Sequence, residues 1–124
     1  MDVTPLIPAG RQVINAYGDG GFTISGTRWQ GSVLVFPTRT LAWEPTSLAE
    51  LDEESLRPVM EAEDRPELLL LGCGPAMAPV PAALRMALRS VGIKLEIMDT
   101  GAACRTYTIL LPEDRSVAAA LIAV

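Results

Sequence analysis

The side chains in this sequence that could carry out chemistry gather in two short stretches. One is a tight glycine loop around Cys73, and the other begins at Asp99. Backbone N–H groups of a glycine loop can bind an anion, and a nearby arginine can add positive charge. A thiolate at Cys73 could be a nucleophile or redox group, and Asp99 could be a general base. The candidate ligand-binding residues are Gly72, Cys73, Gly74, Asp99, Thr100 and Arg105.

The sequence contains no histidine, and this excludes several kinds of site. Ser-His-Asp and Cys-His catalytic pairings and histidine-based metal sites cannot form. The two cysteines, Cys73 and Cys104, have no C-x-x-C spacing, so we expect neither a disulfide framework nor a structural zinc site. The dinucleotide-binding pattern G-x-G-x-x-G is not met, because Met77 stands where its last glycine would be. We therefore predict no catalytic residue, no metal and no cofactor.

Each candidate residue also has a structural role that is common in proteins. Gly72 and Gly74 can serve tight turning and close packing, and Asp99 can cap a helix. Cys104 is flanked by small residues and is expected to be a buried apolar side chain. Cys73 is the better thiol candidate because its loop faces a helix, yet the sequence shows no electropositive surroundings for a thiolate. The structural and the chemical interpretations both stay open.

Two predicted strands must position these residues. Residues 68–71 are four consecutive leucines, a pattern typical of a strand buried on both faces of a sheet. Residues 81–91 predict a helix that stops at Gly92, and residues 93–98 alternate as a second strand. A right-handed crossover would make the two strands parallel neighbours. The ends of strands 67–72 and 93–98 would then open into one polar crevice.

The remaining segments predict a single α/β domain over residues 1–124. Residues 1–43 are an irregular lead followed by short strands, and residues 18–21 and 26–27 are expected to turn the chain. Ser47 and Glu50 have capping-box spacing, but Pro58 removes a helix hydrogen bond. The expected elements are an irregular lead at 1–11, strands at 12–17, 22–25, 32–36 and 40–43, a short or broken helix within 46–60, a turn at 112–114 and a last buried strand at 117–124.

Local signals conflict directly after Asp99. Asp99 and Thr100 could cap a helix that begins near Gly101. Residues 102–104 permit a helix, whereas residues 106–109 favour a strand because they are β-branched or aromatic. Propensity alone leaves this segment unassigned.

Composition and charge narrow the class of protein. The chain is 49% hydrophobic and has no apolar run near the roughly 20 residues that cross a membrane, so we expect no stable membrane insertion. The N-terminus lacks the features of a secretory signal, so we expect a cytoplasmic protein. Net charge is −5, which disfavours nucleic-acid binding. Residues 44–67 hold nine of the fifteen acidic residues, and they form either a solvated surface or an acidic docking surface for a partner.

Several short motifs carry a resemblance to a known family. They are Ile14-Asn15-Ala16-Tyr17-Gly18, Phe22-x-Ile24-x-Gly26, Gly31-Ser32-Val33-Leu34-Val35, Glu67-Leu68-Leu69-Leu70-Leu71-Gly72-x-Gly74, Gly92-Ile93, Met98-Asp99-Thr100, Ala102-Ala103-Cys104-Arg105-Thr106-Tyr107, Ile109-Leu110 and Val117-Ala118-Ala119-Ala120-Leu121-Ile122. With these motifs the chain resembles, over nearly its whole length, the domain-of-unknown-function family that includes the mitochondrial complex I (NADH:ubiquinone oxidoreductase) assembly factor 3.

The resemblance implies a fold and a kind of function. The implied fold is a compact three-layer α/β domain with a mixed central sheet, a short β-rich N-terminal part and two to three helices, and residues 102–107 are implied to be helical. Members of the family have no established catalytic activity and are linked to respiratory-complex assembly or membrane-protein biogenesis. Two residues depart from the family pattern, Cys73 where threonine is usual and Thr108 where asparagine is frequent. Cys73 would be a poorer acceptor than a hydroxyl for a ligand at this loop.

Two functions follow as hypotheses. The first is a non-enzymatic adaptor or assembly-factor-like domain that acts through surface contacts with unknown protein partners, with self-association into a homo-oligomer as a further option. The alternative is a small-molecule or anion-binding domain, even a minor enzyme, that uses the crevice at the ends of strands 67–72 and 93–98. A third hypothesis, in which Cys73 is a redox thiol, has less support because the sequence shows no group that would stabilise the thiolate.

Overall fold

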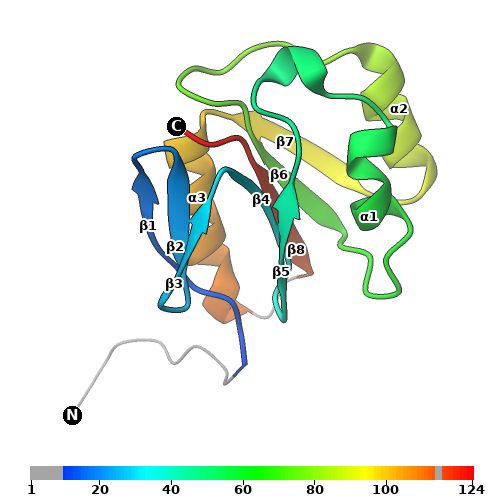
Figure 1. Ribbon diagram of the computed structural model, residues 1–124. Helices are drawn as coiled ribbons and strands as arrows, with labels where there is room; N and C mark the ends of the chain where they lie inside the picture. Colours follow the sequence, from blue (N-terminus) through cyan, green and yellow to red (C-terminus); the bar gives the residue numbers. More distant parts are fainter. Residues whose placement is uncertain (1–9, 114–115) are drawn as a thin grey trace.

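In the computed structural model, residues 10–113 and 116–124 are described, and their strands form two sheets (Figure 1). The strands are β1 (Ile14–Gly18), β2 (Gly21–Ile24), β3 (Thr27–Gln30), β4 (Ser32–Val35), β5 (Thr40–Trp43), β6 (Leu68–Gly72), β7 (Lys94–Met98) and β8 (Val117–Leu121). The helices are η1 (Leu48–Glu50), η2 (Glu54–Leu56), α1 (Arg57–Met60), α2 (Ala82–Ser90), α3 (Thr100–Leu110) and η3 (Leu111–Glu113). The predicted lead at residues 1–11 and the predicted turn at 112–114 lie partly outside the described residues.

The larger sheet has five strands in the order β5-β4-β8-β6-β7 and is mixed. β6 runs parallel to both β7 and β8, whereas β4 runs antiparallel to β5 and β8. Gly72 at the end of β6 lies opposite Met98 at the end of β7, so the two strands end at the same edge of the sheet. The predicted pair of parallel neighbours is therefore confirmed. The last strand, β8, ends at Leu121 and is the middle strand of the sheet.

The leucine run of β6 supplies both faces of this sheet. Leu69 and Leu71 contribute to one hydrophobic core, and Leu70 contributes to the other. All three side chains are 0–1% exposed. Apolar and polar residues alternate along a strand only when one of its faces meets water. Both faces of β6 are covered, which explains the uninterrupted apolar run.

The domain has three layers, and a hydrophobic core lies between each pair of neighbouring layers. Figure 1 shows α1 and α2 on one side of the five-stranded sheet, and α3 with β1–β3 on the other. The core on the side of α1 and α2 contains Leu56, Leu84 and Leu88. The core on the side of α3 contains Phe22 and Tyr107. The domain is thus an α/β fold of three layers with a β-rich N-terminal part, as the resemblance implied. No helix among the described residues is long and apolar enough to cross a membrane.

The N-terminal strands form an antiparallel sheet in the order β1-β2-β3. The predicted turn between the first two strands is present, and Asp19 and Gly20 adopt positive φ angles there. The predicted second turn falls at Ser25 and Gly26 rather than at residues 26–27, and β3 follows it directly. β3 is mostly exposed, so its pattern gave little sign of a strand.

The segment between β5 and β6 contains a broken helix, as predicted, but one detail of its capping was wrong. Ser47 makes no capping hydrogen bond with its side chain. The residue before it, Thr46, donates instead from its backbone N–H and its hydroxyl to the Glu50 carboxylate, each at 2.8 Å. Pro58 occupies the first turn of α1, where no helical hydrogen bond is lost.

The segment with conflicting signals is helical. Asp99 caps α3, because its Oδ1 atom accepts a hydrogen bond from the backbone N–H of Ala102 at 2.8 Å. Ala103, Cys104 and Tyr107 point into the core from one face of this helix. Burial of this face outweighs the weak strand preference of the threonine and isoleucine residues near the helix end.

Candidate functional site

Five of the six predicted ligand-binding residues meet where β6 and β7 end and α3 begins. The Thr100 hydroxyl accepts a hydrogen bond from the Gly74 N–H at 2.9 Å and donates one to the Ile122 carbonyl at 2.7 Å. The Thr100 N–H in turn donates to the Gly74 carbonyl at 2.9 Å. These bonds link the glycine loop, the start of α3 and the end of β8. We call this arrangement the strand-end junction.

The two glycines are required at this junction for different reasons. A Cβ atom at Gly72 would lie 2.9 Å from the Thr100 Cα atom, so only glycine lets the helix start approach the strand this closely. Gly74 has φ +100°, a backbone conformation that other residues rarely adopt. Both glycines therefore have the structural role that the sequence suggested for them.

The junction is filled by protein groups. Thr100 is fully buried, and Cys73 is 6% exposed. The Cys73 N–H donates to the Met98 carbonyl at 2.8 Å, and the Gly74 N–H is held by Thr100. The loop amides that were expected to face an anion thus have partners within the protein. Ligand binding by these residues stays a prediction that the geometry does not favour.

The surroundings of both thiols oppose reactivity. Desolvation by burial raises the pKa of Cys73, and it raises the pKa of Cys104 to about 12. Asp99 adds to both shifts, because its negative charge disfavours a thiolate. A nucleophilic or redox cysteine needs the opposite, a thiolate stabilised at neutral pH.

We expect iodoacetamide to alkylate Cys73 more slowly in the folded protein than it alkylates a small model thiol at the same pH. The physical reason is that the buried thiol is both protonated and screened from the reagent. Mass spectrometry of the labelled peptide over time gives the rate, and the same protein in concentrated urea serves as the control. Alkylation faster than the model thiol would restore the redox hypothesis.

Arg105, the sixth predicted residue, lies apart from the junction. Its Nη1 atom donates to the Tyr17 hydroxyl at 3.3 Å, across to β1. Tyr17 is 42% exposed and was not among the predicted site residues. The two residues are 88 positions apart in the chain, so no local pattern could pair them.

A groove of about 570 Å³ runs between β1 and α3 and includes this pair. We call it the β1–α3 groove. β1 is an edge strand of the three-stranded sheet, and α3 packs beside it. The lining residues are Ile14, Asn15, Ala16, Tyr17, Cys104, Arg105, Thr108 and Ile109.

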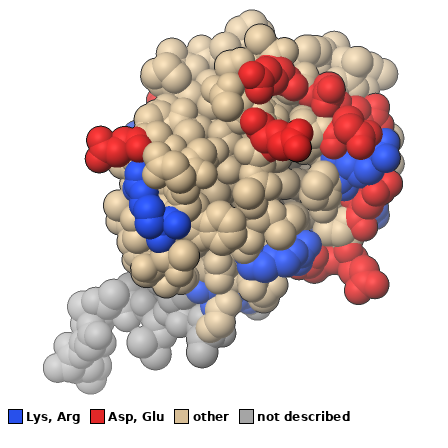
Figure 2. All heavy atoms as spheres, viewed as in Figure 1, with Lys and Arg blue, Asp and Glu red and all other residues tan. Residues whose placement is uncertain are grey.

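A second groove, of about 550 Å³, lies beside β5 and is acidic. We call it the acidic groove. β5 is the edge strand at one side of the large sheet, where its outer side has no neighbouring strand. Figure 2 shows acidic side chains gathered beside β5 and over the segment that includes α1. The lining residues are Leu34, Leu41, Ala42, Trp43, Glu44, Pro45, Glu50, Asp52, Glu54, Ser55 and Pro58.

Hydrogen bonds hold the walls of the acidic groove in place. The Trp43 indole N–H donates to the Ser55 carbonyl at 2.7 Å and ties the segment to β5. Hydrogen bonds from the Thr46 backbone and hydroxyl lower the pKa of Glu50, so this carboxylate stays charged at neutral pH. Asp52 Oδ1 accepts from the Ser55 N–H at 2.8 Å. The negative charges therefore stand on an ordered surface.

None of these sites resembles a metal centre. Within residues 10–113 and 116–124, no group of three or more histidine, cysteine or acidic side chains could hold a metal ion. The carboxylates of the acidic groove are spread along the segment rather than converging on one point.

The three-layer arrangement defines the class of domain. A Bordetella pertussis protein described as a Mth938-like domain has the same fold, with a TM-score of 0.82 and 24% sequence identity over 98% of this chain and 91% of that chain. The family is also clear from the sequence. The chain belongs to the family of proteins of unknown function DUF498/DUF598, whose model matches residues 14–122.

Relatives of known name or structure agree with this assignment. The chain is 35% identical over 109 residues to the NADH dehydrogenase [ubiquinone] 1 alpha subcomplex assembly factor 3 of Rattus norvegicus. This match covers 88% of the chain and 59% of the rat protein, so the chain spans about three fifths of that relative's length. A crystal structure described as an outer membrane protein from Bartonella henselae is 39% identical, with a TM-score of 0.86 over 93% of this chain and 97% of that chain.

Proposed function

We propose that this domain is a non-enzymatic, assembly-factor-like interaction domain whose acidic groove docks a protein partner. The observation that carries the proposal is the groove beside β5. Four carboxylates line it, from Glu44, Glu50, Asp52 and Glu54, and no lysine or arginine is among its lining residues. A surface of one charge beside an open strand edge attracts and orients a partner of opposite charge.

Apolar residues of the groove lining add contact area beside the carboxylates. Leu41 on β5 is 37% exposed, and the neighbouring Ala42 is exposed too. Apolar groups at the centre of a contact with charged groups around them are the usual anatomy of a protein interface. Arg57 lies outside the lining and pairs with Glu54 at 2.6 Å, but both side chains are more than half exposed, so this surface ion pair is weak and Glu54 stays open to a partner.

The named relative indicates the biological setting of the proposal. The rat relative is named as an assembly factor of the NADH dehydrogenase [ubiquinone] 1 alpha subcomplex. We extend this to the present chain as a role in the biogenesis of a respiratory complex or of membrane proteins. The extension is a proposal because the chain matches only 59% of the rat protein.

The state of the candidate catalytic groups supports a non-enzymatic role. The Thr100 hydroxyl and the Asp99 carboxylate take part in the hydrogen bonds of the junction and the helix cap. The cysteine thiols are buried and protonated. The position of Arg105 in a separate groove, paired with Tyr17, counts against the alternative function, small-molecule or anion binding at the strand ends.

Charge reversal in the acidic groove tests the proposal. We expect Glu44→Lys combined with Glu54→Lys to reduce partner capture at least about tenfold, because each reversal replaces attraction by repulsion at the contact. The measurement is quantitative mass spectrometry of proteins that co-purify with the tagged domain, followed by the affinity of the purified partner. Both side chains are exposed, so the variant should fold.

The matched control changes the net charge by the same amount at another place. Glu96→Lys combined with Glu113→Lys alters residues of β7 and η3, which do not line the acidic groove. We expect this control to retain capture. Equal loss in both variants would indicate a dependence on net charge alone, and unchanged capture in the groove variant would rule out the groove as the docking surface.

A further inference from the structure

We propose that the β1–α3 groove binds a small amphipathic carboxylate, with the carboxylate at Arg105 and Tyr17 and an alkyl chain along Ile14 and Ile109. This site is separate from the acidic groove and does not depend on the proposed docking function. It would make the domain a binder of a medium-chain fatty acid or of a ligand with the same chemistry.

The polar end of the groove has an arginine that lacks an acidic partner among the described residues. Arg105 makes one hydrogen bond through its Nη1 atom, to the Tyr17 hydroxyl. Other basic residues, among them Arg39, Arg57 and Lys94, form ion pairs within the part of the chain that the structure describes. A guanidinium has five N–H donors in a planar fork that fits a carboxylate. Most of these N–H donors are therefore left to hydrogen-bond a ligand.

A glycine in α3 shapes this polar end. A Cβ atom at Gly101 would lie 2.6 Å from the Tyr17 hydroxyl and 3.2 Å from Arg105 Nη1. The absence of a side chain at Gly101 therefore lets Tyr17 lie over the first turn of the helix and hold the guanidinium. The fold thus brings a cation and a hydroxyl together at one end of the groove.

The rest of the groove is mostly apolar, and its two other polar residues, Asn15 and Thr108, use their side chains in hydrogen bonds within the protein. Ile14 and Cys104 are 8% and 3% exposed and form part of the wall, and Ala16 lies between the polar residues of β1. Ile109 lines the groove although 66% of the residue is exposed. Tyr17, which is 42% exposed, lines the same groove, so two large exposed apolar side chains share one concave surface, and such a patch marks a binding site. The volume of about 570 Å³ is within the usual range for small-molecule sites.

Charge and size together select the ligand class. Arg105 is the only charged residue in the lining, so the groove matches one negative charge better than the two of a phosphate monoester. The lining has no second aromatic face beside Tyr17 that would stack a nucleobase. An alkyl chain would instead cover Ile14 and Ile109 and remove their apolar surface from water. A monocarboxylate with an alkyl tail satisfies both ends.

The test is a titration of the whole chain with sodium decanoate below its micelle concentration, followed by two-dimensional NMR or calorimetry. Decanol, which has the tail without the charge, and inorganic phosphate, which has charge without the tail, are the comparison probes. We expect saturable binding of decanoate with NMR shifts at residues of β1 and α3. Decanol should bind at least about tenfold more weakly, because it cannot form the charge-assisted hydrogen bonds to Arg105.

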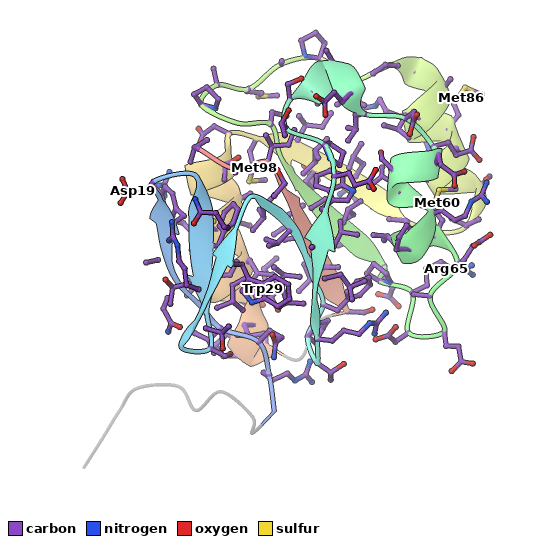
Figure 3. All side chains as sticks on the ribbon, viewed as in Figure 1. Asp19, Trp29, Met60, Arg65, Met86 and Met98 are labelled. Atoms are coloured by element: carbon purple, nitrogen blue, oxygen red, sulfur yellow. The ribbon has the colours of Figure 1, made fainter. Side chains whose placement is uncertain are left out.

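Matched variants assign the binding to the groove. Arg105→Gln and Ile109→Gln should each weaken decanoate binding about tenfold or more, and Gly101→Ala should weaken it by displacing Tyr17. The controls are Arg89→Gln and Met86→Gln on α2, since Met86 is 69% exposed and projects outward there (Figure 3), so both controls should leave binding unchanged.

Three results would overturn the proposal: no saturable binding of decanoate, equal binding of decanoate and decanol, or unchanged binding in Arg105→Gln. The Glu44→Lys and Glu54→Lys variant should bind decanoate as the wild type does. Failure of this site is therefore distinguishable from failure of the docking function.

Discussion

Thr100→Val should lower the free energy of unfolding by about 2–4 kcal/mol, although valine has nearly the shape of threonine. The hydroxyl is fully buried and bonds both the Gly74 N–H and the Ile122 carbonyl. Valine fills the same space but leaves these two polar groups without partners, and each buried group left unpaired costs about 1–3 kcal/mol. Urea unfolding followed by circular dichroism measures the change.

Two further variants separate the hydroxyl from the rest of the side chain. Thr100→Ser keeps the hydrogen bonds and should lose only about 1 kcal/mol, the cost of one buried methyl group. Thr108→Val removes a hydroxyl of the same helix that is exposed and bonds only the Cys104 carbonyl, so its effect should be within about 0.5 kcal/mol. A loss below about 1 kcal/mol for Thr100→Val would mean that the fold does not depend on the hydrogen bonds of this hydroxyl. The prediction from the sequence that Thr100 binds a ligand would then regain support.

Leu70→Ala should lower the free energy of unfolding by about 2–5 kcal/mol, because it opens a cavity in a packed core. Leu70 is 1% exposed and reaches the core formed with α3 and the three-stranded sheet. The strands beside it in the sheet, β7 and β8, would hold the backbone in place, so little collapse can refill the space. Unfolding in urea measures the loss, with the slope of the transition as a check on two-state behaviour.

The matched control is Leu41→Ala on the edge strand β5. Leu41 is 37% exposed and belongs to neither core, so its truncation opens no closed cavity and should cost only about 1 kcal/mol, less than Leu70→Ala. Similar losses for the two variants would contradict the placement of β6 as a strand covered on both faces.

The elements that follow local rules could be predicted from the sequence. The leucine run, the helix that stops at Gly92 and the alternating strand after it predicted β6, α2 and β7 with ends within two residues of those observed. These elements could be predicted because the hydrophobic pattern and the turn residues that define each one lie within its own segment. The cap at Asp99 was predicted for the same reason, since its partner is three residues away.

The strand order and the contents of the crevice depend on residues far apart in the chain. β8 lies between β4 and β6, and no local signal places the last strand in the middle of the sheet. The Thr100 hydroxyl fills the predicted crevice because Ile122, 22 residues later, arrives beside it. The helical state of α3 was implied by the family resemblance and not by propensity, since tertiary burial of Tyr107 decides it.

Docking of a partner at the acidic groove beside β5 can be tested by contact chemistry. The most direct measurement is zero-length carbodiimide crosslinking of the domain to its purified partner, because this reagent joins carboxylates only to amines in direct contact. We expect crosslinked peptides that contain the carboxylates of Glu44, Glu50, Asp52 or Glu54, and we expect these peptides to be lost in the charge-reversed variant. Crosslinks that map instead to Glu96 or Glu113, with the groove residues unmodified, would contradict docking at the acidic groove.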